Sequence, residues 1–256
     1  MLTLDGLSKH FGGVRAVDDV TLTIDEGEIF GLIGPNGSGK STTVNLITGL
    51  YAPTKGRVIL EGRDLTAEPQ HERTAAGVAR TFQNIRLFGN LTVAQNLWVA
   101  QNGAEQRRHH YLSRWFKAGG EHAPEIEELL RFSRLHSKRD VLAGALSFGE
   151  MRRLEMARAL ASSPRIVLLD EPAAGASLED GQLLAERIRD IRERGVTVLL
   201  IEHMMELVMG ITDRLAVLNF GSKIAEGTPA EVQADPQVRA AYLGSRHDRK
   251  KAMEHA

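Results

Sequence analysis

The sequence has 256 residues, of which 42% are hydrophobic and 25% charged, and its formal net charge at pH 7 is −1. This length and composition suit one α/β domain or two small lobes with a sizeable core. The near-neutral balance argues against a nucleic-acid-binding protein. The absence of cysteine excludes disulfides and suits a reducing compartment. Neither a membrane-spanning run nor a signal peptide is recognisable, so we expect a cytosolic chain that would reach a membrane only through a partner.

Short apolar stretches near the N-terminus predict a small antiparallel sheet. They cover residues 2–7, 14–24 and 57–61, and they are broken by glycine and aspartate. Residues 28–33 then predict a short buried strand, and residues 42–50 a helix that Gly49 ends.

The sequence GPNGSGKS, residues 34–41, joins that strand to that helix. It matches the phosphate-binding pattern G-x-x-x-x-G-K-[ST], the P-loop. Glycines let successive backbone N–H groups converge on one anion, and the helix N-terminus adds further N–H groups and its positive dipole end. Lys40 is predicted to contact the β- and γ-phosphates and the Ser41 hydroxyl to bind Mg²⁺. A simple glycine-rich turn before a helix would not need Gly39, Lys40 and Ser41 together.

The C-terminal half of the chain alternates strands with helices. Residues 165–170, 196–201 and 214–219 are apolar on both faces, as central parallel strands are. The helices are predicted between and after them, over residues 150–161, 180–193 and 204–211. This alternation implies a parallel sheet that is covered on both faces.

An acidic pair, Asp170 and Glu171, ends the first of these strands. Ligands bind at the carboxyl ends of parallel strands, so Asp170 can hold Mg²⁺ and Glu171 can polarise an attacking water. The alternative is an acidic helix start with Pro172 near the first turn. The P-loop upstream favours the functional interpretation.

Residues 84–161 have a mostly helical pattern and no buried-strand run, which predicts an inserted helical lobe. Its residues 106–117 are rich in arginine, histidine and aromatics, which suits either a lipid or partner contact or a solvated helix. Within the lobe, Ser147 and Glu150 form a capping-box pattern before an amphipathic helix. The serine hydroxyl, Gly149 and the helix N-terminus would also suit an anion, and both interpretations can hold together.

Two isolated polar residues carry little information alone. Gln83 lies at the junction of core and helical lobe, and His203 follows the strand 196–201 on its carboxyl side. Their order along the chain is more informative: P-loop, Gln83, Leu-Ser-x-Gly-x, Asp-Glu, His203. This order resembles the nucleotide-binding subunit of ABC transporters over nearly the whole chain.

The resemblance implies that two such subunits close head to tail around two ATP molecules. Glu171 would then be the catalytic base, His203 would contact the γ-phosphate and orient the water, and Gln83 would sense Mg²⁺ and that water. Mg²⁺ would be held at Ser41, Gln83 and Asp170. The resemblance also implies four kinds of contact to ATP. An aromatic side chain, Phe11, would stack on adenine, and Val17 would lie beside the ribose. The serine and glycine of the partner's signature motif would be Ser147 and Gly149, and the P-loop contacts would be Gly34, Asn36, Gly37, Ser38, Gly39, Lys40, Ser41 and Thr42.

A finer resemblance rests on residues 80–88, 91–93 and 241–244. They look like the longer ATPase subunit of branched-chain amino acid importers, and urea or amide importers and lipopolysaccharide exporters share parts of the pattern. The resemblance implies integral membrane permease subunits, a second ATPase subunit that is the same chain or a paralogue, and a peripheral position on the inner face of the cell membrane. The chain departs from the usual pattern at Phe148, at Glu150 and in residues 174–177, where the usual aspartate is replaced by Ser177.

We therefore predict an α/β fold: a P-loop NTPase core with a mainly parallel sheet, an N-terminal antiparallel β subdomain and an inserted helical subdomain. Its domains would be the core, 1–83 and 162–230, the helical subdomain, 84–161, and a C-terminal helix and tail, 231–256. The expected function is ATP hydrolysis that drives solute uptake, without nucleic acid as a partner. A soluble ABC ATPase that moves no solute is the rival, but such proteins usually carry two cassettes or a long coiled-coil insert.

Overall fold

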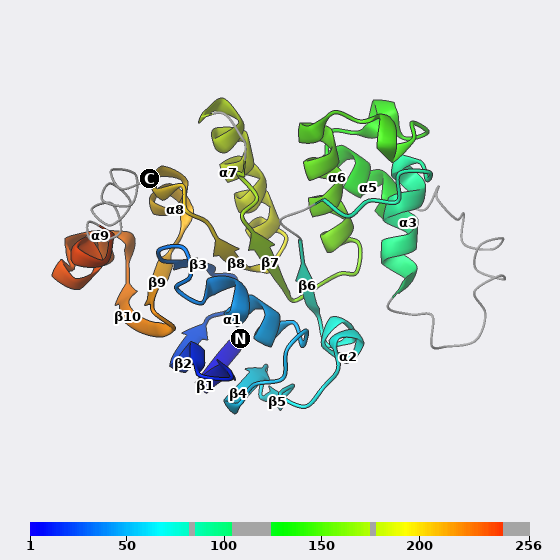
Figure 1. The fold of residues 1–256 in the computed structure, drawn as a ribbon. Coiled ribbons are helices and arrows are strands. Elements are labelled where there is room, and N and C mark those ends of the chain that lie inside the picture. The colour runs from blue at the N-terminus through cyan, green and yellow to red at the C-terminus, as the bar shows by residue number, and fades with distance from the viewer. Residues whose placement is uncertain (82–84, 104–123, 175–177, 243–256) are drawn as a thin grey trace, which may run out of the picture. The chain divides into compact units, whose positions relative to one another are not determined.

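The computed structural model describes residues 1–81, 85–103, 124–174 and 178–242 (Figure 1). The chain divides into two compact units, one of residues 1–73 with 168–256 and one of residues 74–167. The helical subdomain expected over 84–161 lies inside the second unit, and its bounds as a domain stay a prediction. Gln83 and residues 106–117 lie outside the described residues, as do residues 175–177.

An antiparallel sheet forms the N-terminal part of the first unit, as predicted. Its strand order is β2-β1-β4-β5. Leu2 pairs with Ile24 on one side and with Leu60 on the other, so three strands bury their apolar residues together. The strands are β1 (Leu2–Phe11), β2 (Val14–Ile24), β4 (Lys55–Leu60) and β5 (Arg63–Asp64).

The central sheet has the order β10-β9-β3-β8-β7-β6. Strand β3 is parallel to both β8 and β9, and β10 returns antiparallel to β9. Every residue of β3, β7 and β8 is buried, which explains why their sequences are continuously apolar. The bounds are β3 (Ile29–Ile33), β6 (Val78–Arg80), β7 (Ile166–Asp170), β8 (Thr197–Ile201), β9 (Arg214–Asn219) and β10 (Ser222–Gly227). The predicted strands are confirmed, and β5, β6 and β10 had not been predicted.

The helices of the first unit follow these strands. The predicted helices are confirmed within a few residues. Helix α2 had not been predicted, and α9 overlaps the start of the C-terminal segment, 231–256, for which a helix was expected. Helix α9 begins at a capping box in which Thr228 and Glu231 exchange hydrogen bonds. The helices are α1 (Lys40–Ile47), α2 (Gln70–Ala75), α7 (Leu178–Glu193), α8 (Met205–Ile211) and α9 (Pro229–Ala234).

A buried arginine closes the C-terminal end of α1. Arg73 is 1% exposed, and its Nη1 donates to the carbonyls of Leu46 at 2.5 Å and Ile47 at 2.9 Å. Its Nε and Nη2 donate to the carbonyls of Glu68 and Thr66. A helix C-terminus has carbonyls without intrahelical partners and a negative dipole end, so a cation is stabilising there. Arg73 thereby holds the helix whose other end carries the P-loop.

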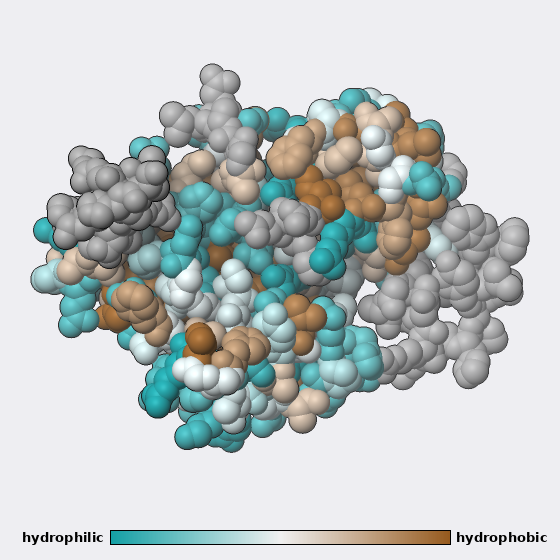
Figure 2. Space-filling view, viewed as in Figure 1, coloured by the Kyte–Doolittle hydropathy of each residue, from teal (hydrophilic) through white to brown (hydrophobic). Residues whose placement is uncertain are grey.

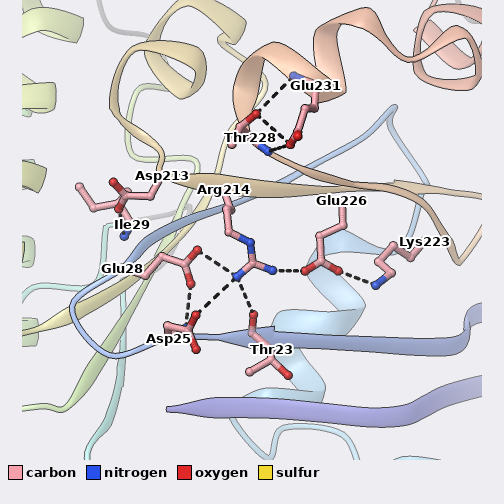
Figure 3. Close-up of polar contacts among 10 residues, drawn as sticks. All are labelled: Thr23, Asp25, Glu28, Ile29, Asp213, Arg214, Lys223, Glu226, Thr228 and Glu231. Carbon is pink, nitrogen blue, oxygen red and sulfur yellow. Dashed lines mark hydrogen bonds and ion pairs between the residues drawn. The ribbon is translucent and has the colours of Figure 1, made fainter.

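A partly buried charge cluster lies at the end of β3 that is opposite to the P-loop (Figure 3). Arg214, the first residue of β9, donates to the carboxylates of Glu28 at 3.2 Å and of Glu226, and lies 3.8 Å from Asp25. The Arg214 guanidinium also lies over the Phe30 ring, 5.4 Å from its centroid. Burial raises the pKa of Glu28, and the Asp25 N–H and the Arg214 charge oppose that rise. The cluster ties β3, β9 and β10 together by their side chains.

The second unit is mainly helical among its described residues. Its core is built from apolar side chains of the three α-helices, among them Leu97, Ile126, Leu130 and Leu154. Figure 2 shows further apolar residues on the surface over α3 and α6. The helices are α3 (Val93–Gly103), α5 (Pro124–Phe132) and α6 (Phe148–Leu160), with the short turns η2 (His136–Lys138) and η3 (Ala143–Ala145). Across the described ranges, no helix has the length and apolarity needed to span a membrane.

Candidate nucleotide-binding and hydrolysis site

The P-loop lies between β3 and α1, and its backbone requires glycine at two positions. Gly34 and Gly39 have φ angles of +152° and +107°. A Cβ on Gly34 would lie 2.2 Å from the carbonyl oxygen of Leu218, and one on Gly39 would lie 2.5 Å from that of Ala16. The loop is therefore pressed between β9 and β2, which leaves its shape little freedom.

Lys40 lies inside the curl of this loop. It is 7% exposed, and its ammonium donates to the carbonyls of Gly34 at 2.7 Å and Pro35 at 3.0 Å. Burial lowers the pKa of Lys40, while the negative charges of Glu171 and Asp170 raise it. Those two carboxylates thus act on the P-loop cation, although they come from the end of a different strand.

The P-loop also has an unsatisfied hydroxyl. Ser38 is 2% exposed, and its Oγ has no hydrogen-bond partner in the described part of the chain. A buried polar atom without a partner costs roughly 1–3 kcal/mol. A phosphate oxygen would accept from this hydroxyl and from the Lys40 ammonium, so the loop fits a phosphate group. Ser41, at the start of α1, is exposed and can reach a cation beside that phosphate.

The chain turns sharply where β7 ends. Asp170 is 5% exposed, while Glu171 has a left-handed backbone with φ of +49°. The Glu171 N–H donates to the Ile201 carbonyl at 2.9 Å, and the Glu171 carbonyl accepts the Ala174 N–H at 3.1 Å. A non-glycine residue in this region is strained by about 1–3 kcal/mol, and such strain is concentrated at functional sites.

His203 follows β8 at the same edge of the sheet. Its side chain is 63% exposed, and its backbone N–H donates to the carboxylate of Glu202 at 3.0 Å. The sequence interpretation missed Glu202, although a carboxylate directly after a buried strand was the signal that identified Asp170.

The residues expected at the nucleobase and beside the ribose, Phe11 and Val17, lie on the antiparallel sheet. Phe11 is 45% exposed and contacts Tyr51 edge to face, with ring centroids 5.3 Å apart. The Lys9 ammonium lies 5.1 Å from the Phe11 centroid and donates to the Ala52 carbonyl at 2.7 Å. Val17 is buried in β2 beside Gly39. The contacts of Lys9 and Tyr51 with Phe11 had not been predicted. Lys9 could have been found, because residues two apart in a strand place their side chains on the same face.

The signature residues lie in the second unit. The capping box at α6 is confirmed, because Glu150 N–H donates to Ser147 Oγ at 3.4 Å and Ser147 N–H donates to the Glu150 carboxylate at 3.0 Å. Lys138 also donates to Glu150 at 2.7 Å and, with Ser147, lowers the pKa of Glu150 to about 2. Within the described residues, a Cβ on Gly149 would meet nothing within 4 Å, and Phe148 is 58% exposed. The beginning of α6 is therefore open to a ligand.

Comparisons with known proteins agree with this geometry. Residues 17–174 match the ABC transporter family, and residues 222–248 match the family of branched-chain amino acid ATP-binding cassette transporters. The chain is 42% identical over 254 residues to the high-affinity branched-chain amino acid transport ATP-binding protein BraF of Pseudomonas aeruginosa, covering 95% of this chain and 98% of that protein.

Solved structures show the same fold. An ATP-binding cassette of an ABC transporter in its ADP conformation superposes with a TM-score of 0.82 at 33% identity, over 95% of this chain and 98% of that one. A dimeric cassette in a post-hydrolysis state, bound to ADP and phosphate, has a TM-score of 0.75 at 26% identity, over 90% of this chain and 99% of that one. With its P-loop, acidic strand end and signature helix in place, the chain belongs to the ABC transporter family as an ATP-binding cassette.

Proposed function

We propose that this protein is the ATPase subunit of an importer for branched-chain amino acids or a related amino acid or amide. The observation that carries the ATPase function is the P-loop itself, with the buried Lys40 ammonium and with a Ser38 hydroxyl that has no hydrogen-bond partner among the described residues. The solute class rests on BraF, whose name states branched-chain amino acid transport, and on the C-terminal family match.

Each residue of the site has a chemical task in hydrolysis. Lys40 and the P-loop N–H groups neutralise and orient the phosphates, and Phe11 stacks on the base. Mg²⁺, which supplies charge neutralisation at the transferred phosphoryl group, would be held by Ser41 and Asp170, with Gln83 nearby. Glu171 takes a proton from the attacking water, and His203 contacts the γ-phosphate and orients that water.

The complete site needs a second ATPase subunit. Ser147 and Gly149 of one subunit contact the γ-phosphate held by the P-loop of the other. The accessible start of α6 supports this arrangement, since nothing in the described residues covers Gly149. The dimer, two copies or this chain with a paralogue, would bind permease subunits and so lie peripherally on the inner face of the cell membrane.

The decisive variant is Glu171→Gln, which keeps the side-chain shape but loses the base. Turnover should fall about 10²–10⁴-fold while ATP binding persists, because a general base contributes that much and the P-loop is untouched. Glu186→Gln, at an exposed position of α7, is the matched control and should hydrolyse normally. Near-normal hydrolysis by Glu171→Gln would remove Glu171 from the catalytic role.

The solute is tested with the chain and its permease in proteoliposomes. ATP-dependent uptake of labelled leucine should occur with the wild-type chain and be absent with Glu171→Gln. Uptake of urea or a short amide in place of leucine would move the assignment to the related importers. ATP turnover that no membrane protein stimulates would favour the soluble, non-transport alternative.

A further inference from the structure

Glu202 is a buried carboxylate to which the proposed mechanism gives no task. It is 0% exposed and follows the last residue of β8. Its one ion-pair neighbour within the described ranges is the His203 ring, with Nδ1 at 3.8 Å. Moving an ionised carboxylate out of water is costly unless its oxygens are hydrogen-bonded. The contacts of this carboxylate therefore indicate what it does.

The two carboxylate oxygens bind two different chain segments. Oε1 accepts the backbone N–H of Ala173 at 2.6 Å. Oε2 accepts the N–H of His203 at 3.0 Å and that of Met204 at 3.4 Å. Hydrogen bonds to an ionised acceptor are shorter and roughly twice as strong as neutral ones. One side chain thus bridges the segment after Glu171 and the segment that begins with His203.

The end of β8 holds the Glu171 turn at two successive points. The Ile201 carbonyl accepts the N–H of Glu171, and the next residue, Glu202, accepts the N–H of Ala173. Glu171 has its left-handed backbone between these attachments. A strained conformation of this kind persists only when the surrounding structure holds it.

We propose that Glu202 is a positioning residue that sets Glu171 and His203 relative to each other. It bridges the backbone of Ala173, two residues after Glu171, to the backbone of His203, and it is not itself assigned a contact with substrate. This inference rests on the proposed function, because it assumes that Glu171 and His203 serve one hydrolytic step. Misplacing a reacting group by about 1 Å can cost about 10²-fold in rate, so the bridge matters for turnover more than for binding.

The variant Glu202→Gln separates an effect on turnover from an effect on nucleotide binding. An amide has one accepting oxygen, and its NH₂ would face one of the N–H donors, so one arm of the bridge is lost at nearly constant volume. We expect kcat for ATP to fall about 10–100-fold, the size typical of residues that orient a site from behind. The KM and the nucleotide Kd should stay within about twofold, because the P-loop and Phe11 are untouched.

Glu28→Gln is the matched control. Glu28 is also buried, at 7% exposed, and its carboxylate also accepts a backbone N–H, from Asp25 at 2.7 Å. It lies before β3, at the end of the strand away from the P-loop, so it should lose stability without losing kcat. Equal losses of kcat in the two variants, measured at matched folded fractions, would show that Glu202 has a structural role alone.

A double-mutant cycle tests the coupling to the base. In the Glu171→Gln background, adding Glu202→Gln should reduce the remaining turnover by less than threefold, because the base that must be set relative to His203 is already absent. The inference is overturned if the fold-loss of kcat in the double variant equals the product of the fold-losses in the two single variants. It is also overturned if the turnover of Glu202→Gln is within twofold of wild type. If Glu202→Gln does not fold, Glu202→Asp carries the same test, since it keeps the charge and shortens the bridge. A wild-type chain without ATPase activity would instead overturn the proposed function.

Discussion

The Lys138 ammonium donates to the Glu150 carboxylate across 2.7 Å, and the same carboxylate accepts the N–H of Ser147 at the start of α6. Glu150 stands where the commonest signature sequence of the resembled family has a neutral glutamine. A carboxylate there would repel the phosphate that Ser147 is proposed to contact. Lys138 offsets this charge and keeps the signature helix compatible with an anion.

Lys138→Met should raise the pKa of Glu150 from about 2 toward its usual range, because Lys138 is the largest cause of its depression. A carboxyl group whose pKa is depressed in the folded state stabilises it above the unfolded pKa, and this contribution is lost as pH falls through the folded pKa. The capping box of the wild-type chain should therefore persist below pH 4, and that of the variant should be lost at a higher pH than in the wild type. Carboxyl ¹³C shifts followed through a pH titration measure this. Lys55→Met, at an exposed position of β4, should leave Glu150 unchanged.

Ser147→Arg should abolish turnover and leave nucleotide binding by the single chain intact, because the serine is proposed to act on the ATP of the partner subunit. The measurement is sedimentation with ATP in the Glu171→Gln background. The chain that keeps Ser147 should form a dimer, and the chain that also carries Ser147→Arg should stay monomeric. ADP, which lacks the γ-phosphate, is the control and should leave the chain monomeric. A dimer and normal turnover in the Ser147→Arg variant would reduce Ser147 to a helix cap.

Phe11→Ala should weaken nucleotide binding by roughly 1–3 kcal/mol, the cost found when a base loses an aromatic platform. ATP and GTP should lose similar affinity, since every base has a π-face. Lys9→Met should cost less, about 0.5–1 kcal/mol, by removing the cation over the Phe11 ring. Titration calorimetry measures both, with Tyr51→Phe as the control that keeps the ring contact. Unchanged affinity in Phe11→Ala would place the base elsewhere.

Replacing Leu87 and Phe88 together by serine should uncouple the ATPase from the permease. Phe88 is 48% exposed, with the Arg158 guanidinium 5.0 Å from its ring. The buried Asn96 side chain binds both the N–H and the carbonyl of Phe88, so the backbone is held while the ring stays available to a partner. Basal ATPase activity should survive, while co-purification with the permease and solute-stimulated hydrolysis fall together. Leu183→Ser, another exposed apolar position, is the control; unchanged transport in the double variant would place the coupling surface elsewhere.

Arg73→Met should lower the free energy of unfolding by about 2–5 kcal/mol, because it leaves the carbonyls of Leu46 and Ile47 buried without their donor. Urea denaturation measures the loss. Arg57→Met is the control, because Arg57 pairs with Asp5 on the surface at 59% and 47% exposure, where such pairs contribute about 0–1 kcal/mol. Equal losses would mean that the contacts of Arg73 are no more valuable than a surface ion pair.

Local patterns were enough to predict most of the fold. Continuous apolar runs identified β3, β7, β8 and β9, because strands buried on both faces have no polar side. Strand β10 escaped prediction because all its residues are only half-buried, and β6 because it spans only Val78–Arg80. Strand β10 pairs with β9, which directly precedes it, whereas β6 lies beside β7, which is distant in the sequence.

The local pattern was enough to predict the P-loop and the chemistry proposed for it, because Gly34, Gly39, Lys40 and Ser41 stand in one contiguous segment at the spacing that a phosphate-binding loop requires. Three-dimensional packing was needed to find what supports the P-loop helix and the segments after β7 and β8. Arg73 reaches the end of α1, and Glu202 joins His203 to Ala173, a residue 29 positions away in the chain. Such supports use backbone N–H and carbonyl groups, which every residue type except proline offers alike, so no sequence pattern marks the partner. Chain folding selects these contacts by bringing the two segments together.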